Sequence, residues 1–183
     1  QLGIRGRYTA EGISLSVQSS CGDCELRLSL LAEFNISNVL AAICSQLCLG
    51  KSLKQIAYIV QKLKPVAGRM ELYKRQGHAT IVVDYAHTPD ALDKALLASK
   101  QHCHGKLFCV FGCGGDRDVG KRSLMGEIAE RLSDQVILTD DNVRSENPQD
   151  IINDILAGCI NPERVLIQHD RKTAIKTAAD MAS

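Results

Sequence analysis

The stretch 80-TIVVDYAHTPDALDKAL-96 contains the structural unit that decides the fold of most of this chain. An apolar, β-branched run stops at Asp84, and a Thr-Pro pair then opens a segment with the apolar spacing of a helix. A strand that leads directly into a helix is the building unit of parallel α/β sheets. Asp84, Tyr85 and His87 occupy the step between the two, where a plain connection would use Gly and Asn.

The same unit recurs along the rest of the chain. We expect strands over 79–84, 107–111, 135–139 and 165–168. Helices are expected between and after them, over about 89–101, 121–133, 148–158 and 171–181. Residues 70–75 are expected to add a strand that forms a hairpin with the next through Gln76-Gly77. This alternation predicts an α/β fold of Rossmann-like type, with a mostly parallel sheet flanked by helices.

A different pattern precedes this region. Residues 13–31 alternate as strands, and two helices are expected over 35–49 and 52–63, the first capped by Asn35 and closed by Gly50. The segment "KLKPVAGRM" has the composition of a linker, so we place a domain boundary near residue 65. The chain therefore divides into a smaller α/β segment over 1–65 and a Rossmann-like domain over 66–183.

Length and charge exclude several classes of protein. The 183 residues carry a net charge of +1, which gives no general attraction to nucleic acid or acidic membranes. No run of about 18 apolar residues is present, so no membrane span is expected. The start "QLGIRGRYTA" has neither a Met nor a leader pattern and reads like the interior of a longer protein. We expect a fragment of a cytoplasmic protein.

The eight cysteines lie mostly among apolar neighbours, as small buried hydrophobes do. This usage favours a reducing cytoplasm over a disulfide framework. Cys21 and Cys24 have CxxC spacing, but zinc needs a second pair, and His102 and His104 read as surface residues at a helix end. We expect no metal site here, and we interpret "SSCGDCE" as a hairpin turn at Gly22-Asp23.

Polar residues follow all four predicted strands of the second region. They are "DYAH" at 84–87, "GCGGDRD" at 112–118, "DDNVR" at 140–144 and "HD" at 169–170. The carboxyl ends of strands in an open α/β sheet form the edge where ligands bind. The sequence therefore predicts one shared crevice, whose Arg, Asp and Asn side chains suit a zwitterionic ligand or a phosphate.

The glycine-rich segment in this set matches no standard phosphate loop. Gly115, Gly120 and Lys121 fit the start of G-x-x-x-x-G-K-[ST], but Arg122 stands where Mg²⁺ needs Ser or Thr. A G-x-G-x-x-G pattern fails at Arg117. We expect the glycines to leave backbone N–H groups at a helix N-terminus open to an anion. The alternative is a tight turn with solvated charges.

Five segments resemble the Mur ligases, in the order in which that family has them. They are "LAEFNISNVLAAI", "AGRME", "VVDYAHTPDAL", "CVFGCGGDRDVGKRSLMGEIAE" and "TDDNVRSENPQDIINDI". They are most similar to the branch that adds meso-diaminopimelate to UDP-N-acetylmuramoyl-L-alanyl-D-glutamate in peptidoglycan synthesis. The resemblance implies ATP-dependent amide formation through an acyl phosphate, which the incoming amine attacks.

The resemblance also implies how the chain fits into a three-domain ligase. Residues 1–65 would be the last part of the central ATPase domain, and 66–183 would be most of the C-terminal domain. The P-loop, the Mg²⁺ ligands and a carbamylated Lys would lie upstream, so no catalytic or metal-binding residue is expected in this chain. The implied partners are ATP, the nucleotide dipeptide and diaminopimelate, bound by a monomer without nucleic acid or membrane.

Two groups of binding residues follow from the resemblance. The ATP-binding group consists of Asn35, Asn38, Arg69, Asp84, Tyr85 and His87. The diaminopimelate-binding group consists of Arg117, Asp141, Asn142 and Arg144. Family members that add lysine lack the arginine at position 144, since lysine has no second carboxylate to bind. The family pattern is D-N-P-R, and Val143 replaces the proline here, which removes a fixed φ angle from the loop.

Other interpretations of these residues remain open from the sequence alone. Asn35 also suits an N-cap, Asn38 a polar helix position and His87 a solvated or capping residue. Arg144 could instead pair with Glu146 or cap the helix near Pro148. A free-standing module that binds a nucleotide or an amino acid without catalysis is the alternative to a ligase.

Overall fold

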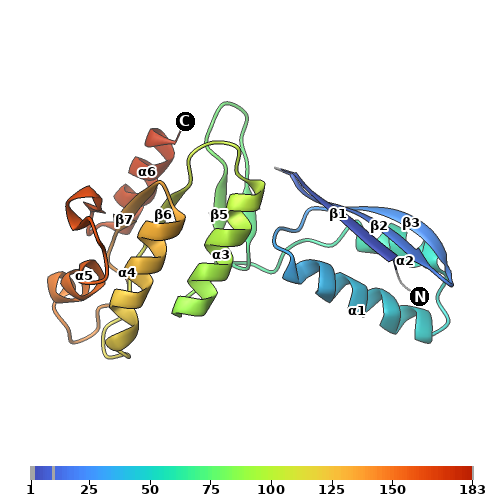
Figure 1. The fold of residues 1–183 in the computed structure, drawn as a ribbon, viewed down its shortest axis with the longest axis horizontal. Helices are drawn as coiled ribbons and strands as arrows, with labels where there is room; N and C mark the ends of the chain where they lie inside the picture. Colours follow the sequence, from blue (N-terminus) through green and yellow to red (C-terminus); the bar gives the residue numbers. More distant parts are fainter. Residues whose placement is uncertain (1–2, 10, 183) are drawn as a thin grey trace. The chain divides into compact units, whose positions relative to one another are not determined.

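The computed structural model describes residues 3–9 and 11–182, which separate into two compact units. One unit comprises residues 1–72 and 82–84, and the other comprises 73–81 and 85–183 (Figure 1). The predicted boundary near residue 65 falls in the segment that follows helix α2 (Leu53–Val60). We describe each unit by itself.

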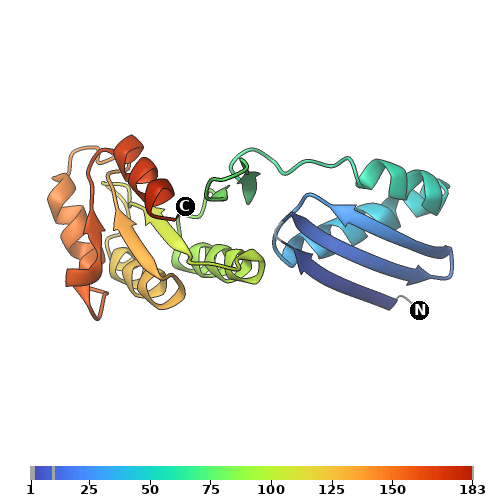
Figure 2. The same ribbon diagram turned by 90° about the horizontal axis from the view of Figure 1, so that it is seen from above.

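The first unit is an antiparallel sheet covered by two helices (Figure 2). Its strands are β1 (Gly3–Thr9), β2 (Gly12–Ser19) and β3 (Gly22–Leu28), and its helices are α1 (Phe34–Cys48) and α2 (Leu53–Val60). Strand β1 was not predicted, because its two glycines hide the apolar alternation. Alternate residues of β2 and β3 form one buried core with the inner faces of both helices, and this core includes Leu15, Val17, Leu26, Val39, Ile43 and Ile56.

The hairpin between β2 and β3 is confirmed, but its turn was predicted in the wrong place. Ser19 pairs with Gly22, so the turn residues are Ser20 and Cys21. The register pairs Ile13 with Leu28 and Leu15 with Leu26, which keeps all four side chains in the core. Burial of these apolar pairs therefore decides the turn position.

The ends of helix α1 follow the prediction at one terminus only. Gly50 has φ +79°, its N–H donates to Leu47 O at 2.9 Å, and the N–H of Lys51 donates to Gln46 O at 3.1 Å. These bonds form the Schellman motif that closes a helix. Asn35 is not the N-cap, because α1 begins at Phe34 after Glu33. The Asn35 side chain reaches back instead and donates to Leu31 O at 2.6 Å.

The second unit contains a parallel sheet in the order β6-β7-β8, with helices on both faces. Its strands are β6 (Phe108–Phe111), β7 (Gln135–Leu138) and β8 (Leu166–Ile167). The helices are α3 (Pro89–His102), α4 (Gly120–Leu132), α5 (Pro148–Leu156) and α6 (Arg171–Met181). A short 3₁₀ helix, Pro162–Arg164, precedes β8. The predicted order of strands and helices is confirmed in this unit.

Alternate residues of the sheet face two separate cores. Cys109, Phe111, Val136 and Leu138 pack with apolar residues of α3, α4 and α5. Ile137 packs instead with Ala174 and Ala178 of α6, together with Phe108 and Val110. Strands that are buried on both faces are typical of a doubly wound parallel sheet. The predicted Rossmann-like fold is therefore confirmed.

The strand predicted over 79–84 does not join this sheet. It is the short strand β5 (Ile81–Val83), which pairs with β4 (Glu71–Tyr73) in a sheet of two strands. The predicted partnership of these two segments is confirmed. Ile81 and Val83 are 37% and 41% exposed, so β5 lacks the two-sided burial of a central parallel strand.

Buried and exposed side chains differ from expectation at several cysteines and one histidine. All eight thiols are free, but only Cys109 and Cys113 are buried, whereas Cys44 and Cys48 are exposed on α1. Burial raises the pKa of the Cys109 thiol to about 12 and that of Cys113 to about 11, so both stay protonated at neutral pH. His102, expected at the surface, is buried at the end of α3.

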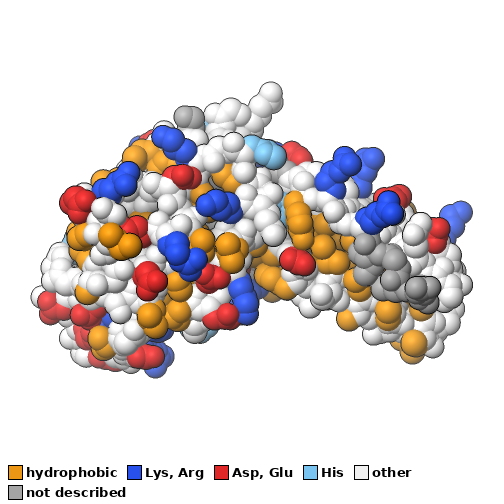
Figure 3. All heavy atoms as spheres, viewed as in Figure 1, with side chains coloured by type: hydrophobic (Ala, Val, Ile, Leu, Met, Phe, Trp, Pro, Cys, Tyr) orange, Lys and Arg blue, Asp and Glu red, His pale blue; other side chains and the backbone are white. Residues whose placement is uncertain are grey.

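Charged side chains of both signs are interspersed on the molecular face drawn in Figure 3, in keeping with the small net charge. Across residues 3–9 and 11–182, no helix has both the length and the apolar character needed to cross a membrane.

Candidate functional site

The carboxyl ends of β6, β7 and β8 meet at one edge of the parallel sheet. The Thr139 N–H donates to Phe111 O at 3.0 Å, which joins the end of β7 to the end of β6. The Asp140 N–H and the Thr139 hydroxyl donate to His169 O at 3.2 and 3.1 Å, which joins β7 to the loop after β8. The His169 ring and the Asp140 carboxylate add a contact of 2.8 Å. Three of the four predicted polar sets therefore adjoin one another.

The fourth polar set divides at Asp84, which belongs to the first unit, whereas Tyr85, Ala86 and His87 belong to the second. Ala86 packs against the core under α3 and α4. Lys121, in the first turn of α4, donates from Nζ to His87 O at 2.9 Å. The start of α3 is thus tied to the start of α4.

Two glycines allow the loop after β6 to lie directly against the loop after β7. A Cβ atom on Gly112 would lie 2.0 Å from Thr139 O, and one on Gly115 would lie 1.9 Å from Val143 O. The Gly115 N–H donates to Asn142 O at 2.9 Å across the same contact. Both obstacles are backbone atoms, so a side chain at either position would force the loops apart. The glycines serve close packing between the loops.

The expectation that the glycine N–H groups are open to an anion is wrong for two of them. The Gly115 N–H is bonded to Asn142 O, and the Gly120 N–H is bonded to Asp118 Oδ1 at 2.9 Å. Asn142 O in the loop after β7 and the nearby Asp118 carboxylate already accept these two N–H groups, so neither is open to an anion.

A buried arginine fastens the same two loops. Arg122 is 1% exposed, and its Nη1 and Nη2 each donate to an oxygen of Glu146 at 2.8 Å. Nη1 also bonds Asp154 at 2.8 Å, and Nη2 reaches Gly114 O at 3.3 Å. The Glu146 hydrogen bond raises the pKa of Arg122 further above its ordinary value, despite desolvation. The Arg122 hydrogen bond, followed by the Asp116 N–H, holds the pKa of Glu146 below its usual value.

The lowered pKa of Glu146 means that the pair is ionised at neutral pH. Because the folded-state pKa of this carboxyl is depressed, its contribution to stability is present above the unfolded value. That contribution is lost as the pH falls through the folded-state pKa.

The predicted amino-acid-binding residues lie on these two fastened loops. Arg144 has φ +52° and donates from Nη1 to Gly115 O at 2.7 Å and to Asn142 O at 3.2 Å. A Cβ on Gly114 would be 2.8 Å from that Nη1 and 3.8 Å from Cγ of Arg117. The Arg117 and Arg144 side chains thus both adjoin Gly114, and both residues are exposed.

The remaining members of the predicted group lie on the loop after β7. Asp141 Oδ1 accepts the N–H and the side-chain amide of Asn142 at 2.8 and 3.1 Å. Both residues are exposed. The geometry therefore gathers two guanidinium groups, a carboxylate and an amide on two adjoining loops, an arrangement suited to a ligand that carries carboxylates and an amine.

The two competing fates of Arg144 are not found. The Glu146 carboxylate binds Arg122 and the Asp116 N–H. The N-cap of α5 is Asn147, whose side chain accepts the Gln149 N–H at 2.9 Å. The Ser145 hydroxyl donates to the Asp116 carboxylate at 2.6 Å.

Four of the predicted nucleotide-binding residues lie in the first unit. Asp84 Oδ2 accepts the Met70 N–H at 2.8 Å, beside Arg69, and Met70 has φ +47°. Asn38 donates to Asn35 Oδ1 at 3.3 Å, so these two side chains are paired on α1. Asp84 thus holds the backbone next to Arg69 in an uncommon conformation.

The other two predicted nucleotide-binding residues, Tyr85 and His87, contact each other in the second unit. Their rings meet edge-on, with centroids 5.0 Å apart and planes at 61°. His87 Nδ1 lies 3.0 Å from Tyr85 O. The segment before α3 therefore presents two exposed rings in a defined arrangement.

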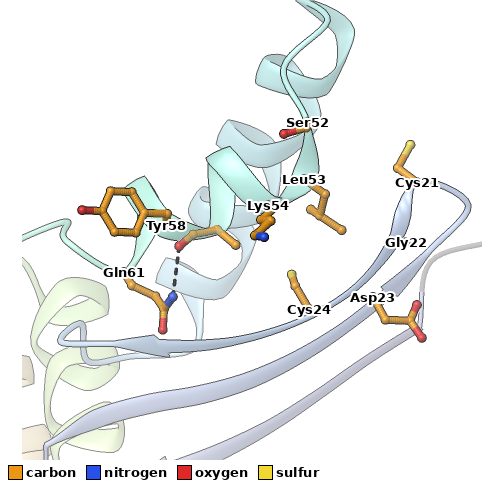
Figure 4. Close-up of a pocket in the computed structure, with 10 residues that line it drawn as sticks. Cys21, Gly22, Asp23, Cys24, Ser52, Leu53, Lys54, Tyr58 and Gln61 are labelled. Atoms are coloured by element: carbon orange, nitrogen blue, oxygen red, sulfur yellow. Dashed lines mark hydrogen bonds between the residues drawn. The ribbon is translucent and has the colours of Figure 1, made fainter.

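A pocket of about 590 Å³ lies elsewhere, between the β2–β3 turn and helix α2 (Figure 4). Cys21, Cys24, Lys54, Tyr58 and Gln61 are among the residues that line it. Its lining includes none of the predicted binding residues, so it is separate from the site described above. In the described parts of the chain, no group of three or more His, Cys, Asp or Glu side chains could hold a metal ion.

Arg122 and Glu146 were missed when the sequence was considered alone. Arg122 was noted only as a mismatch to the phosphate-loop pattern, and Glu146 only as a possible partner of Arg144. One signal was present in the sequence: Arg122, Met125, Ala129 and Leu132 share the buried face of α4. A charge on an apolar helix face predicts a buried ion pair, although the spacing does not identify its partner.

Comparison with known proteins places these observations in a family. Residues 68–183 match the family model described as "Mur ligase, glutamate ligase domain". A UDP-N-acetylmuramoyl-L-alanyl-D-glutamate–2,6-diaminopimelate ligase of Vibrio cholerae is 51% identical over 175 residues, which are 96% of this chain and 35% of that protein.

Solved structures give the same fold. A structure of a ligase with the same name has a TM-score of 0.74 and 38% identity, and the match covers 97% of this chain and 37% of that one. Mycobacterium tuberculosis folylpolyglutamate synthase complexed with ADP has a TM-score of 0.73 at 20% identity, over 95% of this chain and 39% of that one, which shows the fold alone. The chain spans little more than a third of the length of these relatives.

Proposed function

Because the chain belongs to the Mur ligase family, we propose that it is part of an ATP-dependent ligase that joins meso-diaminopimelate to UDP-N-acetylmuramoyl-L-alanyl-D-glutamate. Residues 1–65 are the last part of the central ATPase domain in this proposal, and residues 66–183 are most of the C-terminal domain. The observation that carries the proposal is the placement of Arg117 and Arg144 beside Gly114, in a chain half identical to a ligase of that name.

The proposed chemistry assigns binding roles to this chain. ATP converts the carboxylate of the nucleotide dipeptide into an acyl phosphate, and the amine of diaminopimelate displaces the phosphate to form the amide. Arg117 and Arg144 bind carboxylates of the amino acid, while Asp141 and Asn142 bind its polar groups. The P-loop, the Mg²⁺ ligands and the carbamylated Lys belong to segments outside this chain in the proposal. The enzyme works in the cytoplasm, where ATP is available, as a monomer.

The chain also supplies the proposed ATP contacts. Asp84 binds the ribose hydroxyls and positions Arg69 through the Met70 N–H, so that Arg69 contacts phosphate. Asn35 and Asn38 lie near the adenine, and Tyr85 and His87 flank the nucleotide. The direct pairing of Asn38 with Asn35 supports a joint role for them.

The first prediction tests the ligase assignment. The full-length protein should turn over ATP to ADP continuously only when both the nucleotide dipeptide and diaminopimelate are present, because the acyl phosphate needs one substrate and its discharge needs the other. The 183-residue chain alone should release none, because phosphoryl transfer depends on a P-loop and metal ions that it does not supply. A coupled ADP assay measures both. If the full-length protein shows no turnover dependent on diaminopimelate, the proposed function is wrong.

The second prediction concerns Asp84→Ala in the full-length ligase. A ribose contact that is equal in the ground and transition states should affect mainly the KM for ATP. Because Asp84 also holds the Met70 N–H beside Arg69, we expect kcat to fall as well. Steady-state kinetics with varied ATP give both values. Asp90→Ala is the control, since Asp90 makes an exposed pair with Lys94 on α3. An ATP KM and a kcat that both match the unaltered enzyme would remove Asp84 from the site.

A further inference from the structure

Arg122 contacts no substrate in the chemistry proposed above, yet it is the most deeply buried charged side chain among the described residues. It lies on the core face of α4 and is 1% exposed. Its Nε is buried without a hydrogen-bond partner in the described structure. Replacing a buried ion pair by apolar residues is often neutral or stabilising, so a fold that only needed stability could use an apolar side chain here. The pair therefore calls for an explanation beyond stability.

The contacts of Arg122 converge on the two loops that carry the other arginines. Nη2 bonds Gly114 O in the loop after β6, and both terminal nitrogens bond Glu146 in the loop after β7. Glu146 in turn accepts the Asp116 N–H, and the Asp116 carboxylate accepts the Ser145 hydroxyl and N–H. These bonds thus join the two loops at positions that adjoin Arg117 in the loop after β6 and Arg144 in the loop after β7.

We propose that Arg122 and Glu146 are positioning residues that set the separation of the Arg117 and Arg144 side chains, and so select an amino acid with two carboxylates. The inference rests on the proposed function. A planar guanidinium that binds both carboxylate oxygens fixes their relative position, which a single point contact cannot do. The backbone on either side is also constrained, because Asp116 and Arg144 both have φ +52°. This clamp, the ion pair of Arg122 and Glu146, thereby anchors the two exposed arginine side chains on a rigid base.

Asp154 provides a matched control for Glu146. Both are carboxylates that lie 2.8 Å from Arg122 Nη1. Asp154 is on α5 and, among the described residues, forms no hydrogen bond with either loop, whereas Glu146 also binds the Asp116 N–H. Glu146→Gln and Asp154→Asn therefore make the same chemical change on the same guanidinium, and only the first alters the contact between the loops.

The experiment compares both variants in the full-length ligase by two measurements. In Glu146→Gln, the KM for diaminopimelate should rise by about 10- to 100-fold, the scale of a displacement of about 1 Å, with the KM for ATP unchanged. Hydrogen exchange should become faster at the amides of Asp116 and Ser145. Asp154→Asn should leave both KM values and both exchange rates unchanged. Arg122→Lys keeps the positive charge but cannot bind both oxygens of Glu146 with a planar guanidinium. Its effects on the KM for diaminopimelate and on hydrogen exchange should therefore resemble those of Glu146→Gln.

The outcomes separate this inference from the proposed function. Unchanged exchange at both amides in Glu146→Gln overturns the positioning role. Faster exchange with an unaltered diaminopimelate KM overturns the link to substrate choice. Equal effects of Asp154→Asn and Glu146→Gln would show general stabilisation instead and would also overturn it. If the unaltered enzyme has no turnover dependent on diaminopimelate, both the proposed function and the substrate selection are wrong. The hydrogen-exchange rates of the Asp116 and Ser145 amides would still test whether Arg122 and Glu146 hold the loops together.

Discussion

Arg144→Ala in the full-length ligase is expected to raise the KM for diaminopimelate by about 30-fold to several-thousand-fold and to leave the KM for ATP nearly unchanged. The proposed contact is a charge-assisted pair between the guanidinium and the far carboxylate of the substrate. Truncating one partner of such a pair costs roughly 2–5 kcal/mol, which corresponds to that range of affinity. Steady-state kinetics with each substrate varied in turn provide the measurement.

The structure makes this prediction sharper, because Arg144 is held in place before any ligand binds. Its Nη1 donates to Gly115 O and Asn142 O, so little side-chain freedom remains to be lost on binding. Lysine should remain a poor substrate of the variant, because the substitution creates no partner for the side-chain amine of lysine. Arg131→Ala is a suitable control, since Arg131 makes an exposed pair with Asp93. A diaminopimelate KM equal to that of the unaltered enzyme would disprove the assignment.

Gly115→Ala is expected to have a large effect of a different kind. The new methyl group would lie 1.9 Å from Val143 O and 2.7 Å from Val143 C, and neither backbone atom can turn aside as a side-chain end can. The loops must separate, which weakens the Gly115–Asn142 and Arg144–Gly115 hydrogen bonds. Overpacking of this kind typically costs about 1–3 kcal/mol, and we expect the upper end or beyond. Urea unfolding measures the loss, and the diaminopimelate KM should rise with it.

Gly105→Ala is the matched control for this substitution. A Cβ on Gly105 meets nothing within 4 Å, and its φ is outside the left-handed region. The same chemical change there should leave stability nearly unaltered or raise it slightly through the unfolded state. If Gly115→Ala and Gly105→Ala unfold at the same urea concentration, the close approach of the two loops is not a constraint on the fold.

The elements that the sequence predicted well depend on neighbours in the chain. Thr88 and Asp170 cap α3 and α6 by accepting the N–H groups of Ala91 and Thr173, each three residues on. Ser52 and Gln55 form a capping box at α2, and Pro89 and Pro148 stand at the first positions of their helices. Caps and breakers act within one turn, so the order of strands and helices follows from them together with the apolar period.

The elements that the sequence predicted poorly depend on partners far along the chain. The β2–β3 turn is at Ser20-Cys21 because core residues of the two strands must face each other, and Asn35 bonds Leu31 O in place of capping α1. Strand β5 pairs with β4 outside the parallel sheet, which leaves Ile81 and Val83 partly exposed although their residue types suit a central parallel strand. In each case, a tertiary contact outweighs the local preference of the sequence.

The candidate site divides in the same way. The sequence by itself determined the alternating α/β order, and with it the rule that polar residues after β6, β7 and β8 share one edge, because parallel strands all end on the same side. Only the tertiary structure decided that Gly112 and Gly115 accommodate a neighbouring backbone and that Glu146 belongs to Arg122. The physical reason is that a buried guanidinium takes whichever carboxylate the fold brings within hydrogen-bond distance, and this pair is separated by 24 residues of chain.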